Sequence, residues 1–352
     1  MKNKAFKIIS LALALLMLTM GMMGCNVLPD EETDSQTQEA TESESETEVQ
    51  YGNAIDTTGG LRILITSDVH HNKINEWYGL PSTLRMRYWV EAIKKEHAEN
   101  PFDLIIIAGD TSLDHYENQG EYKKESGLAS ARTKEFVDKY VSALPEGVPV
   151  FILPGNHEQF SNEQWKQITG NERQGSVVVE GNLFIMLDNY NSNLEPNRTG
   201  DPEYTPSDVA FIKSELAKNP DCKNVWLVAH HFDSKLETQE FKDLLKTEKR
   251  IKGLFSGHTH KSDVISLGAD FGGKKLAQTG EFSYSYYAAM NQGELTDLYN
   301  SFWGFRDLVI TDEYAMSQYI IPAVSGPVVP FKGSKYTIKI ESRKTVHSVR
   351  FY

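Results

Sequence analysis

Cysteine is scarce in this chain of 352 residues, because only Cys25 and Cys222 are present. A framework of several disulfides is therefore excluded as the support of the fold. Basic side chains are not in excess either, since the formal net charge at pH 7 is −13. A long polyanion requires a basic footprint on its partner, so no nucleic acid is expected to bind. The sequence also lacks an internal repeat of the length typical of solenoids.

The first 25 residues have the character of an export signal. Three lysines precede an apolar run over residues 8–23, and Cys25 follows the small Gly24. This order resembles a bacterial lipoprotein signal peptide over residues 1–25, in which the cysteine becomes the acylated first residue. A plain secretory signal or an uncleaved anchor is the alternative. The expected location is the outer face of a bacterial membrane, to which lipid on Cys25 attaches the protein.

Residues 26–59 are expected to form an acidic tether. Residues 26–50 contain nine acidic side chains and no basic one, together with many Ser, Thr and Gln. Such a composition cannot bury apolar surface, so the segment is predicted to remain solvated. Residues 51–352 then carry a formal charge of about −7.

From Gly60 onward, short apolar runs alternate with amphipathic segments. The strand-like runs are residues 61–67, 103–108, 148–154, 183–187, 225–229 and 253–256. Helices are expected over 82–100 and 130–144, after Ser161, from Thr205 and over 237–250, with Ser82, Ser161 and Thr205 as N-caps. This alternation indicates an α/β domain over residues 60–322. Residues 323–352 are expected to add a small C-terminal β-hairpin, with strands at 336–340 and 346–351.

Five of the strand-like runs end in side chains that can bind metal ions. These are Asp68 and His70, Asp110, Asn156 and His157, His230, and His258 with His260. Ligands of open α/β sheets bind at the carboxyl ends of the strands. Residues i and i+2 of an extended segment point the same way, so each Asp-x-His or His-x-His pair is expected to face one ion. One such histidine is usually a hydrogen-bonded core residue, but five strand ends of this kind indicate a metal site.

The order Asp-x-His, Gly-Asp, Gly-Asn-His-Glu, His and Gly-His-x-His resembles that of the calcineurin-like metallophosphoesterases. The resemblance implies an α/β fold with two mixed β-sheets packed face to face and flanking helices. It also implies hydrolysis of a small phosphoester by a bridging hydroxide at a site with two metal ions. The implied ligands are Asp68, His70 and His260 for the first metal, Asn156, His230 and His258 for the second, and Asp110 for both.

Two further histidines need an interpretation of their own. The resemblance leaves His157 off the metals and beside the substrate, as the catalytic residue. His231 is the alternative to His230 as a ligand, and His230 is preferred because it follows the strand directly. The ligand set contains no thiolate, so manganese, iron and zinc all remain candidates for the two divalent or trivalent ions.

Other residues near the strand ends have less defined roles. His71, His115, Asp188 and Asn189 are expected beside the site, and Phe282, Tyr284, Tyr286 and Tyr287 either line a substrate cleft or pack on a sheet.

Differences from individual subfamilies narrow the substrate. The Asp-Arg-Gly of Ser/Thr phosphatases is missing after Asp110, and Leu113 stands where purple acid phosphatases have a tyrosine. What remains resembles small extracytoplasmic phosphoesterases, so a phosphodiester is slightly favoured over a monoester. The alternative function is that of a non-catalytic surface lipoprotein that binds a ligand or partner. The sequence gives no indication of the oligomeric state.

Overall fold

The computed structural model describes residues 59–72, 80–113, 130–191, 194, 202–283, 303–329 and 337–352. The signal peptide, the tether up to residue 58, His115, Tyr284, Tyr286 and Tyr287 lie outside these residues, and what we expect of them stays a prediction. Within the described ranges, no helix has the length and apolar character needed to cross a bilayer.

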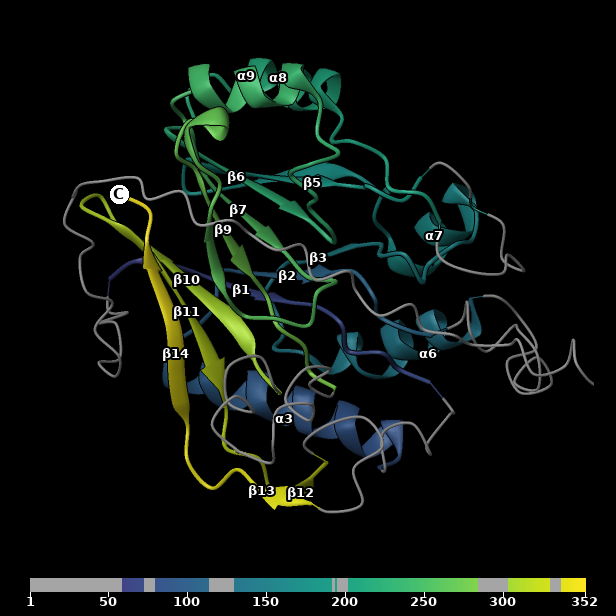
Figure 1. The fold of residues 1–352 in the computed structure, drawn as a ribbon. Coiled ribbons are helices and arrows are strands. Elements are labelled where there is room, and N and C mark those ends of the chain that lie inside the picture. The colour runs from purple at the N-terminus through teal and green to yellow at the C-terminus, as the bar shows by residue number, and fades with distance from the viewer. Residues whose placement is uncertain are drawn as a thin grey trace, which may run out of the picture. The chain divides into compact units, whose positions relative to one another are not determined.

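Two six-stranded mixed sheets form the centre of the fold, as predicted (Figure 1). The first sheet has the order β14-β11-β10-β1-β2-β3, and the second has the order β4-β5-β6-β7-β9-β8. The strands of the first sheet are β1 (Leu61–Thr66), β2 (Leu104–Ala108), β3 (Val150–Leu153), β10 (Phe305–Ile310), β11 (Ala315–Ile321) and β14 (Lys344–Arg350). Those of the second are β4 (Gly175–Val179), β5 (Asn182–Leu187), β6 (Asn224–Ala229), β7 (Ile251–Ser256), β8 (Val264–Ser266) and β9 (Lys275–Gln278). Within each sheet the neighbouring strands β1–β2–β3 and β5–β6–β7 are parallel, so their carboxyl ends lie at one edge.

Helices cover the outer face of each sheet (Figure 1). The first sheet is covered by α3 (Ser82–Glu99), α6 (Ala131–Lys139) and α7 (Asn162–Thr169). The second is covered by α8 (Val209–Lys218) and α9 (Gln239–Thr247). Two short 3-10 turns, η2 (Val141–Ala143) and η3 (Ala269–Phe271), complete these layers.

Alternation of apolar side chains along the strands explains this layering. Ile63 and Ile65 of β1 point into the core between the sheets, whereas Leu64 points toward the helices. In β6, Trp226 likewise faces the core between the sheets, and Leu227 faces α8 and α9. Both faces of these strands are therefore apolar, which is why they appear in the sequence as continuous hydrophobic runs. Each large apolar side chain buried in this way contributes roughly 1.5–3 kcal/mol.

The beginnings of two helices differ from the prediction. Helix α8 is capped by Asp208, which accepts a hydrogen bond from the Phe211 amide at 2.9 Å, so it begins later than a cap at Thr205 implied. Ser82 is the first residue of α3 and not its cap, because its hydroxyl lies 2.8 Å from His71 Nδ1. The prediction for Ser161 is confirmed, since its Oγ accepts a hydrogen bond from the Gln164 amide.

The predicted C-terminal hairpin is wrong. Strand β14 pairs with β11 at the edge of the first sheet, whereas β13 (Ile338–Lys339) pairs with β12 (Pro327–Val328). Val349 of β14 is buried between the sheets, and the following Phe351 packs edge-on against Trp226, with ring centroids 5.0 Å apart. A separate two-stranded hairpin would leave these side chains in water, where such hairpins are only marginally stable. The last strand therefore completes the main sheet.

Candidate metal centre

The loops that follow β1, β2, β3, β6 and β7 meet at one edge of the sandwich. Backbone hydrogen bonds continue the pairing of β1 and β2 beyond the strands, from Asp68 N to Gly109 O and from His70 N to Asp110 O, both at 3.1 Å. This arrangement gathers every side chain that the sequence indicated as a ligand, together with His157. Potential metal-binding groups are Asp68–His70–His260, His70–Asp110–His157 and Asp110–His230–His258.

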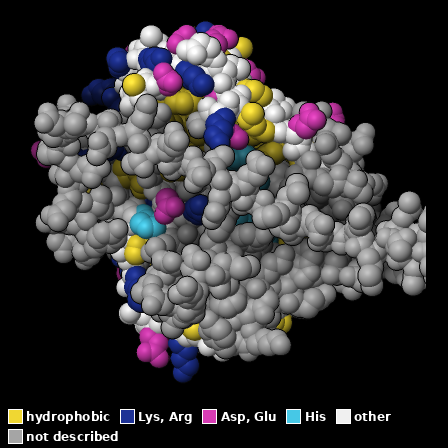
Figure 2. All heavy atoms as spheres, in the orientation of Figure 1, with side chains coloured by type: hydrophobic (Ala, Val, Ile, Leu, Met, Phe, Trp, Pro, Cys, Tyr) yellow, Lys and Arg dark blue, Asp and Glu magenta, His cyan; other side chains and the backbone are white. Residues whose placement is uncertain are grey.

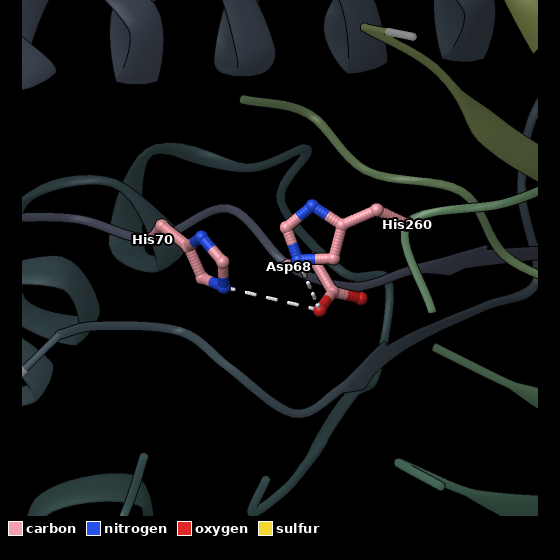
Figure 3. A group of neighbouring side chains, drawn as sticks. All are labelled: Asp68, His70 and His260. Atoms are coloured by element: carbon pink, nitrogen blue, oxygen red, sulfur yellow. Dashed lines mark ion pairs between the residues drawn. The ribbon is translucent and has the colours of Figure 1, made fainter. Parts of the chain in front are cut away.

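The first group surrounds the carboxylate of Asp68 (Figure 3). Asp68 Oδ1 lies 3.4 Å from His260 Nε2 and 3.9 Å from His70 Nε2. The other oxygen, Oδ2, accepts a hydrogen bond from the His258 amide at 3.1 Å. Asp68 is fully buried, and Oδ1 receives no hydrogen bond of normal geometry from the residues that the structure describes. A buried carboxylate oxygen that faces two imidazoles is suited to a cation.

The group Asp110–His230–His258 surrounds the ring of His230. Its Nδ1 lies 2.8 Å from the carbonyl oxygen of Ala108 and donates to it. Its Nε2 therefore faces two acceptors, Asp110 Oδ2 at 3.2 Å and Asn156 Oδ1 at 3.0 Å. His258 Nδ1 lies 3.0 Å from the same Asn156 oxygen. The oxygens that converge on Nε2 need a positive charge among them, either a proton on Nε2 or a metal ion. A hydrogen bond that fixes the other ring nitrogen, here Nδ1, is typical of histidine ligands.

Asp110 lies between the group around Asp68 and the group around His230. Its Oδ2 lies 3.4 Å from His70 Nε2 on one side and 3.2 Å from His230 Nε2 on the other. Burial alone would raise the pKa of this carboxyl group, but the imidazoles of His157 and His230 hold the pKa well below its usual value. Asp110 is therefore a carboxylate at neutral pH and can serve two cations at once.

The protonation of the histidines also fits cation binding. Burial lowers the pKa of His70 and of His258 to about 4, so both rings are neutral at pH 7 and carry a lone pair. Burial acts in the same direction on His230, but Asp110 and Asp68 outweigh it and raise the pKa of His230 to about 10. A proton on His230 thus occupies the place of a metal ion, and metal binding would release it.

The backbone of the cluster is strained. Five of its residues have positive φ angles, namely Asp68 (51°), His70 (48°), Asp110 (50°), His258 (68°) and His260 (54°). A left-handed conformation costs a non-glycine residue roughly 1–2 kcal/mol, and such residues concentrate at functional sites. The Asp-x-His and His-x-His segments are therefore not extended, contrary to our expectation. His258 faces Asn156 whereas His260 faces Asp68, so the prediction that this pair faces one ion is wrong.

Two glycines allow the loops to approach one another this closely. Gly109 has φ of 85°, and a Cβ atom there would lie 2.6 Å from His230 Nδ1. A Cβ atom on Gly257 would lie 2.5 Å from Asp68 Oδ2. Any larger residue at either position would displace a side chain of the cluster.

Glu158 holds two of the loops together, a role that we did not derive from the sequence. Its carboxylate is fully buried, and Oε2 accepts hydrogen bonds from Asp110 N at 3.1 Å and Gly155 N at 2.8 Å. Oε1 accepts from Thr111 Oγ1 and Ser112 N, both at 3.1 Å. Burial and the nearby Asp110 raise the pKa of Glu158 to about 7. Its position directly after Asn156 and His157 was the available signal.

The two histidines with separate interpretations occupy different places. His157 Nε2 lies 3.6 Å from Asp110 Oδ2, and its ring meets that of His70 edge-on at 5.5 Å. His231 Nδ1 lies 2.6 Å from the Tyr190 hydroxyl, and the ring stacks on His258, with ring centroids 4.1 Å apart. It is therefore His230, and not His231, that faces Asp110 and Asn156.

The remaining described residues that the sequence analysis placed near the strand ends form contacts around the centre. His71 Nδ1 lies 2.8 Å from Ser82 Oγ, and Asp188 forms a buried 2.6 Å ion pair with Arg173. Asn189 donates to the carbonyl oxygen of Thr205 at 3.0 Å. Phe282 packs against Trp303 in the hydrophobic core, which agrees with the packing alternative for this residue.

Part of the centre is reachable from solvent. His258 and His260 are half-buried. Figure 2 shows a few histidine side chains among charged and hydrophobic ones on one face of the molecule.

Comparison with known proteins gave a family match. The model of a family described as calcineurin-like phosphoesterase matches residues 61–262. A search of curated proteins gave no match. A solved metallophosphoesterase from Sphaerobacter thermophilus is 14% identical, with coverage of 72% of this chain and 84% of that chain and a TM-score of 0.28. A 5'-nucleotidase from Candida albicans is 13% identical, with coverage of 66% and 49% and a TM-score of 0.35.

Proposed function

The chain belongs to the calcineurin-like phosphoesterase family, and from this premise we propose that it hydrolyses a small phosphoester at a centre of two metal ions. One observation carries the proposal. Asp110 Oδ2 faces His70 of one potential ligand group and His230 of the other, at 3.4 and 3.2 Å. Two ions bound on either side of that oxygen would hold the phosphoryl group and make a bound water acidic enough to attack phosphorus.

The proposed ligand roles are those that the resemblance to the family implies, and the geometry is compatible with them. Asp68, His70 and His260 would hold the first ion, Asn156, His230 and His258 the second, and Asp110 both. The ligand atoms are imidazole nitrogens and carboxylate or amide oxygens, which suit manganese, iron or zinc.

His157 is the residue best placed to act on the substrate. It adjoins Asp110 and His70 at the centre but is only 7% exposed. When water attacks phosphorus and the bond to the leaving oxygen breaks, that oxygen needs a proton or a compensating positive charge. An imidazole at this distance from the shared carboxylate can supply either one.

The proposed location rests on the sequence of the N-terminal region. The basic start, the apolar run and Gly24-Cys25 support an acylated protein on the outer face of a bacterial membrane, separated from it by the acidic tether.

A metal reconstitution assay tests the function. The protein is stripped with a chelator and loaded in turn with manganese, iron or zinc, and nitrophenol release is followed from p-nitrophenyl phosphate and bis(p-nitrophenyl) phosphate. We expect two ions per chain and hydrolysis that returns only with metal. Stoichiometric metal without hydrolysis of either ester would contradict an enzymatic role and leave ligand binding as the function.

A further inference from the structure

His231, which is not among the proposed ligands, lies beside the ligand groups. The ring of His231 stacks on His258 at 4.1 Å with an interplanar angle of 30°. His231 is half-buried, whereas its neighbour His230 is fully buried. The His231 ring is therefore at the rim of the group formed by Asp110, His230 and His258.

Aromatic neighbours fix the orientation of this ring. Tyr190 is almost parallel to it, at 17° and 5.9 Å between centroids, and Tyr204 meets it edge-on at 5.1 Å. Tyr204 is itself held by a 2.6 Å hydrogen bond from its hydroxyl to Glu237. Because the His231 ring is packed on several sides, it cannot turn freely, and its free edge keeps one direction. Such a fixed orientation is what a preorganised binding group requires.

Hydrogen bonding determines which nitrogen that edge presents. His231 Nδ1 lies 2.6 Å from the hydroxyl of Tyr190. A phenol is a stronger acid than a neutral imidazole N–H, so we assign the Tyr190 hydroxyl as the donor and Nδ1 as the acceptor. The proton of the neutral ring then lies on Nε2, which becomes a hydrogen-bond donor at the rim of the centre.

The position of Tyr190 is linked to the loop that carries His157. The Tyr190 amide donates to Asp188 Oδ1 at 2.9 Å, and Asp188 Oδ2 accepts from Arg173 Nε at 2.6 Å. Arg173 also donates to the carbonyl oxygen of Glu158 at 3.1 Å. These hydrogen bonds connect Tyr190, the partner of His231, to the loop that carries His157. The Nε2 donor of His231 is therefore held in a fixed position relative to the ligand groups.

We infer that His231 is a specificity-determining residue, which binds through Nε2–H the ester group that stays on phosphorus when a phosphodiester is hydrolysed. The inference rests on the proposed function and names its substrate class. A monoester offers three terminal oxygens to the metals, whereas a diester offers two and carries a second substituent that must lie away from them. A donor at the rim is suited to that substituent, and Tyr190 positions the donor.

Matched substitutions test the nitrogen and the ring separately. His231→Gln places an amide nitrogen near the position of Nε2, and His231→Asn places one near Nδ1. His231→Phe keeps a ring that can stack on His258, and Tyr190→Phe removes only the orienting hydroxyl. His97→Gln is the control, because His97 lies on α3 and accepts its hydrogen bond from the Phe102 amide, outside the centre.

Two readouts are needed, both on metal-loaded protein with its metal content measured. KM and kcat are determined for bis(p-nitrophenyl) phosphate and p-nitrophenyl phosphate, and Kd is determined by calorimetry for diethyl phosphate and inorganic phosphate. We expect His231→Asn and His231→Phe to raise the diester KM and the diethyl phosphate Kd about 3- to 10-fold, the usual effect of one lost hydrogen bond. The change in kcat and in the two monoester constants should be smaller, His231→Gln should approach the wild type, and Tyr190→Phe should fall between them.

Other results would overturn the inference. Equal effects on the diester and monoester constants, equal behaviour of His231→Asn and His231→Gln, or loss of metal in His231→Gln would each show that His231 has only a structural role. If the wild type binds diethyl phosphate in a His231-dependent manner but hydrolyses neither ester, the proposed function fails and the binding inference stands. If the wild type hydrolyses both esters and the His231 variants match it, only the inference fails.

Discussion

The carboxylate of Asp110 faces the ring of His230, with Oδ2 3.2 Å from Nε2. His230 cannot turn away from this contact, because its other nitrogen donates to the Ala108 carbonyl oxygen at 2.8 Å. The same Asp110 oxygen lies 3.4 Å from His70 Nε2, on the side of the other group. One atom thus connects the two halves of the centre, and its removal should affect both.

The substitution Asp110→Asn is therefore expected to release metal from both groups. Metal content should fall below one ion per chain. Phosphoesterase activity should fall on the order of 10²-fold or more, because loss of a residue that only supports a metal ligand already costs about 10- to 100-fold. Elemental analysis and nitrophenol release measure the two effects. Asp103→Asn is the control, because Asp103 accepts from the Arg62 amide at the opposite end of β2. Retention of two ions in Asp110→Asn would show that the carboxylate is not shared.

Glu158→Gln should weaken the connection between the loops after β2 and β3. The carboxylate accepts four hydrogen bonds, two on each oxygen. A glutamine has one acceptor oxygen and one NH₂ group, so two buried donors would face another donor. We expect a loss of about 1–3 kcal/mol in the free energy of unfolding and weaker metal binding, measured by denaturation with and without metal. Glu163→Gln in the first turn of α7 is the control, and equal stability of both variants would contradict this role.

His71 should make folding stability depend on pH. Burial lowers its pKa to about 4, with Arg85 and Arg132 acting in the same direction and Glu135 opposing them. Between pH 6.5 and 4, the unfolded chain binds a proton at His71 that the folded protein does not bind. The wild type should therefore lose up to about 1.4 kcal/mol per pH unit in this window through His71.

The variant His71→Asn isolates this effect, because it has no titrating group and keeps a polar atom near Ser82 Oγ, the partner of His71 Nδ1. At pH 7 the variant should be the less stable protein because it lacks the packed ring. The difference in unfolding free energy, measured in chelator, should shrink as the pH falls from 6.5 to 4. A difference that stays constant over this range would contradict the assigned pKa shift.

Local patterns in the sequence predict an α/β domain and the place of its centre, and the two packed sheets were expected from the resemblance to the family. Strand β1 carries apolar side chains on both faces, as at Leu64 and Ile65, and its end is marked by Asp68. The left-handed backbone at His70 and His258 could not be predicted, because positive φ is uncommon even for histidine, which adopts it more often than most residues, and the surrounding contacts decide where it occurs.

The sequence also does not show the tertiary contacts that decide between several possible partners of a residue or strand. His230 and His231 both follow β6, and the preference for His230 rested only on its place directly after the strand; the hydrogen bond from His230 Nδ1 to the Ala108 carbonyl oxygen gives the physical reason. Strand β14 could pair with a neighbour in sequence or with the main sheet, and Val349 finds the larger apolar surface in the main sheet. Such choices depend on tertiary contacts between distant segments.

Cys25 is expected to determine where the protein is located. It lies outside the described residues, and the prediction rests on the basic start and the apolar run before it. Cys25→Ser should leave the precursor unprocessed or release the protein from the membrane fraction, whereas Cys222→Ser should change neither. Stable attachment requires more than one acyl chain, so intact-mass analysis should show several lipid groups at Cys25. An unmodified Cys25 in protein taken from native membranes would contradict the location.

His157 provides the last test, which concerns the chemical step. Its Nε2 lies 3.6 Å from Asp110 Oδ2, and the proposed metal ligands do not include it. His157→Ala should therefore keep both ions. If His157 protonates the leaving group, an alkyl ester, whose alkoxide needs a proton, should lose on the order of 10²–10⁴-fold in rate. A nitrophenyl ester should lose much less, because nitrophenolate is stable as an anion. An equal loss with both esters would instead assign His157 to stabilisation of the phosphoryl oxygens, which are alike in the two substrates. Loss of metal in this variant would contradict both roles and make His157 a support of the ligands.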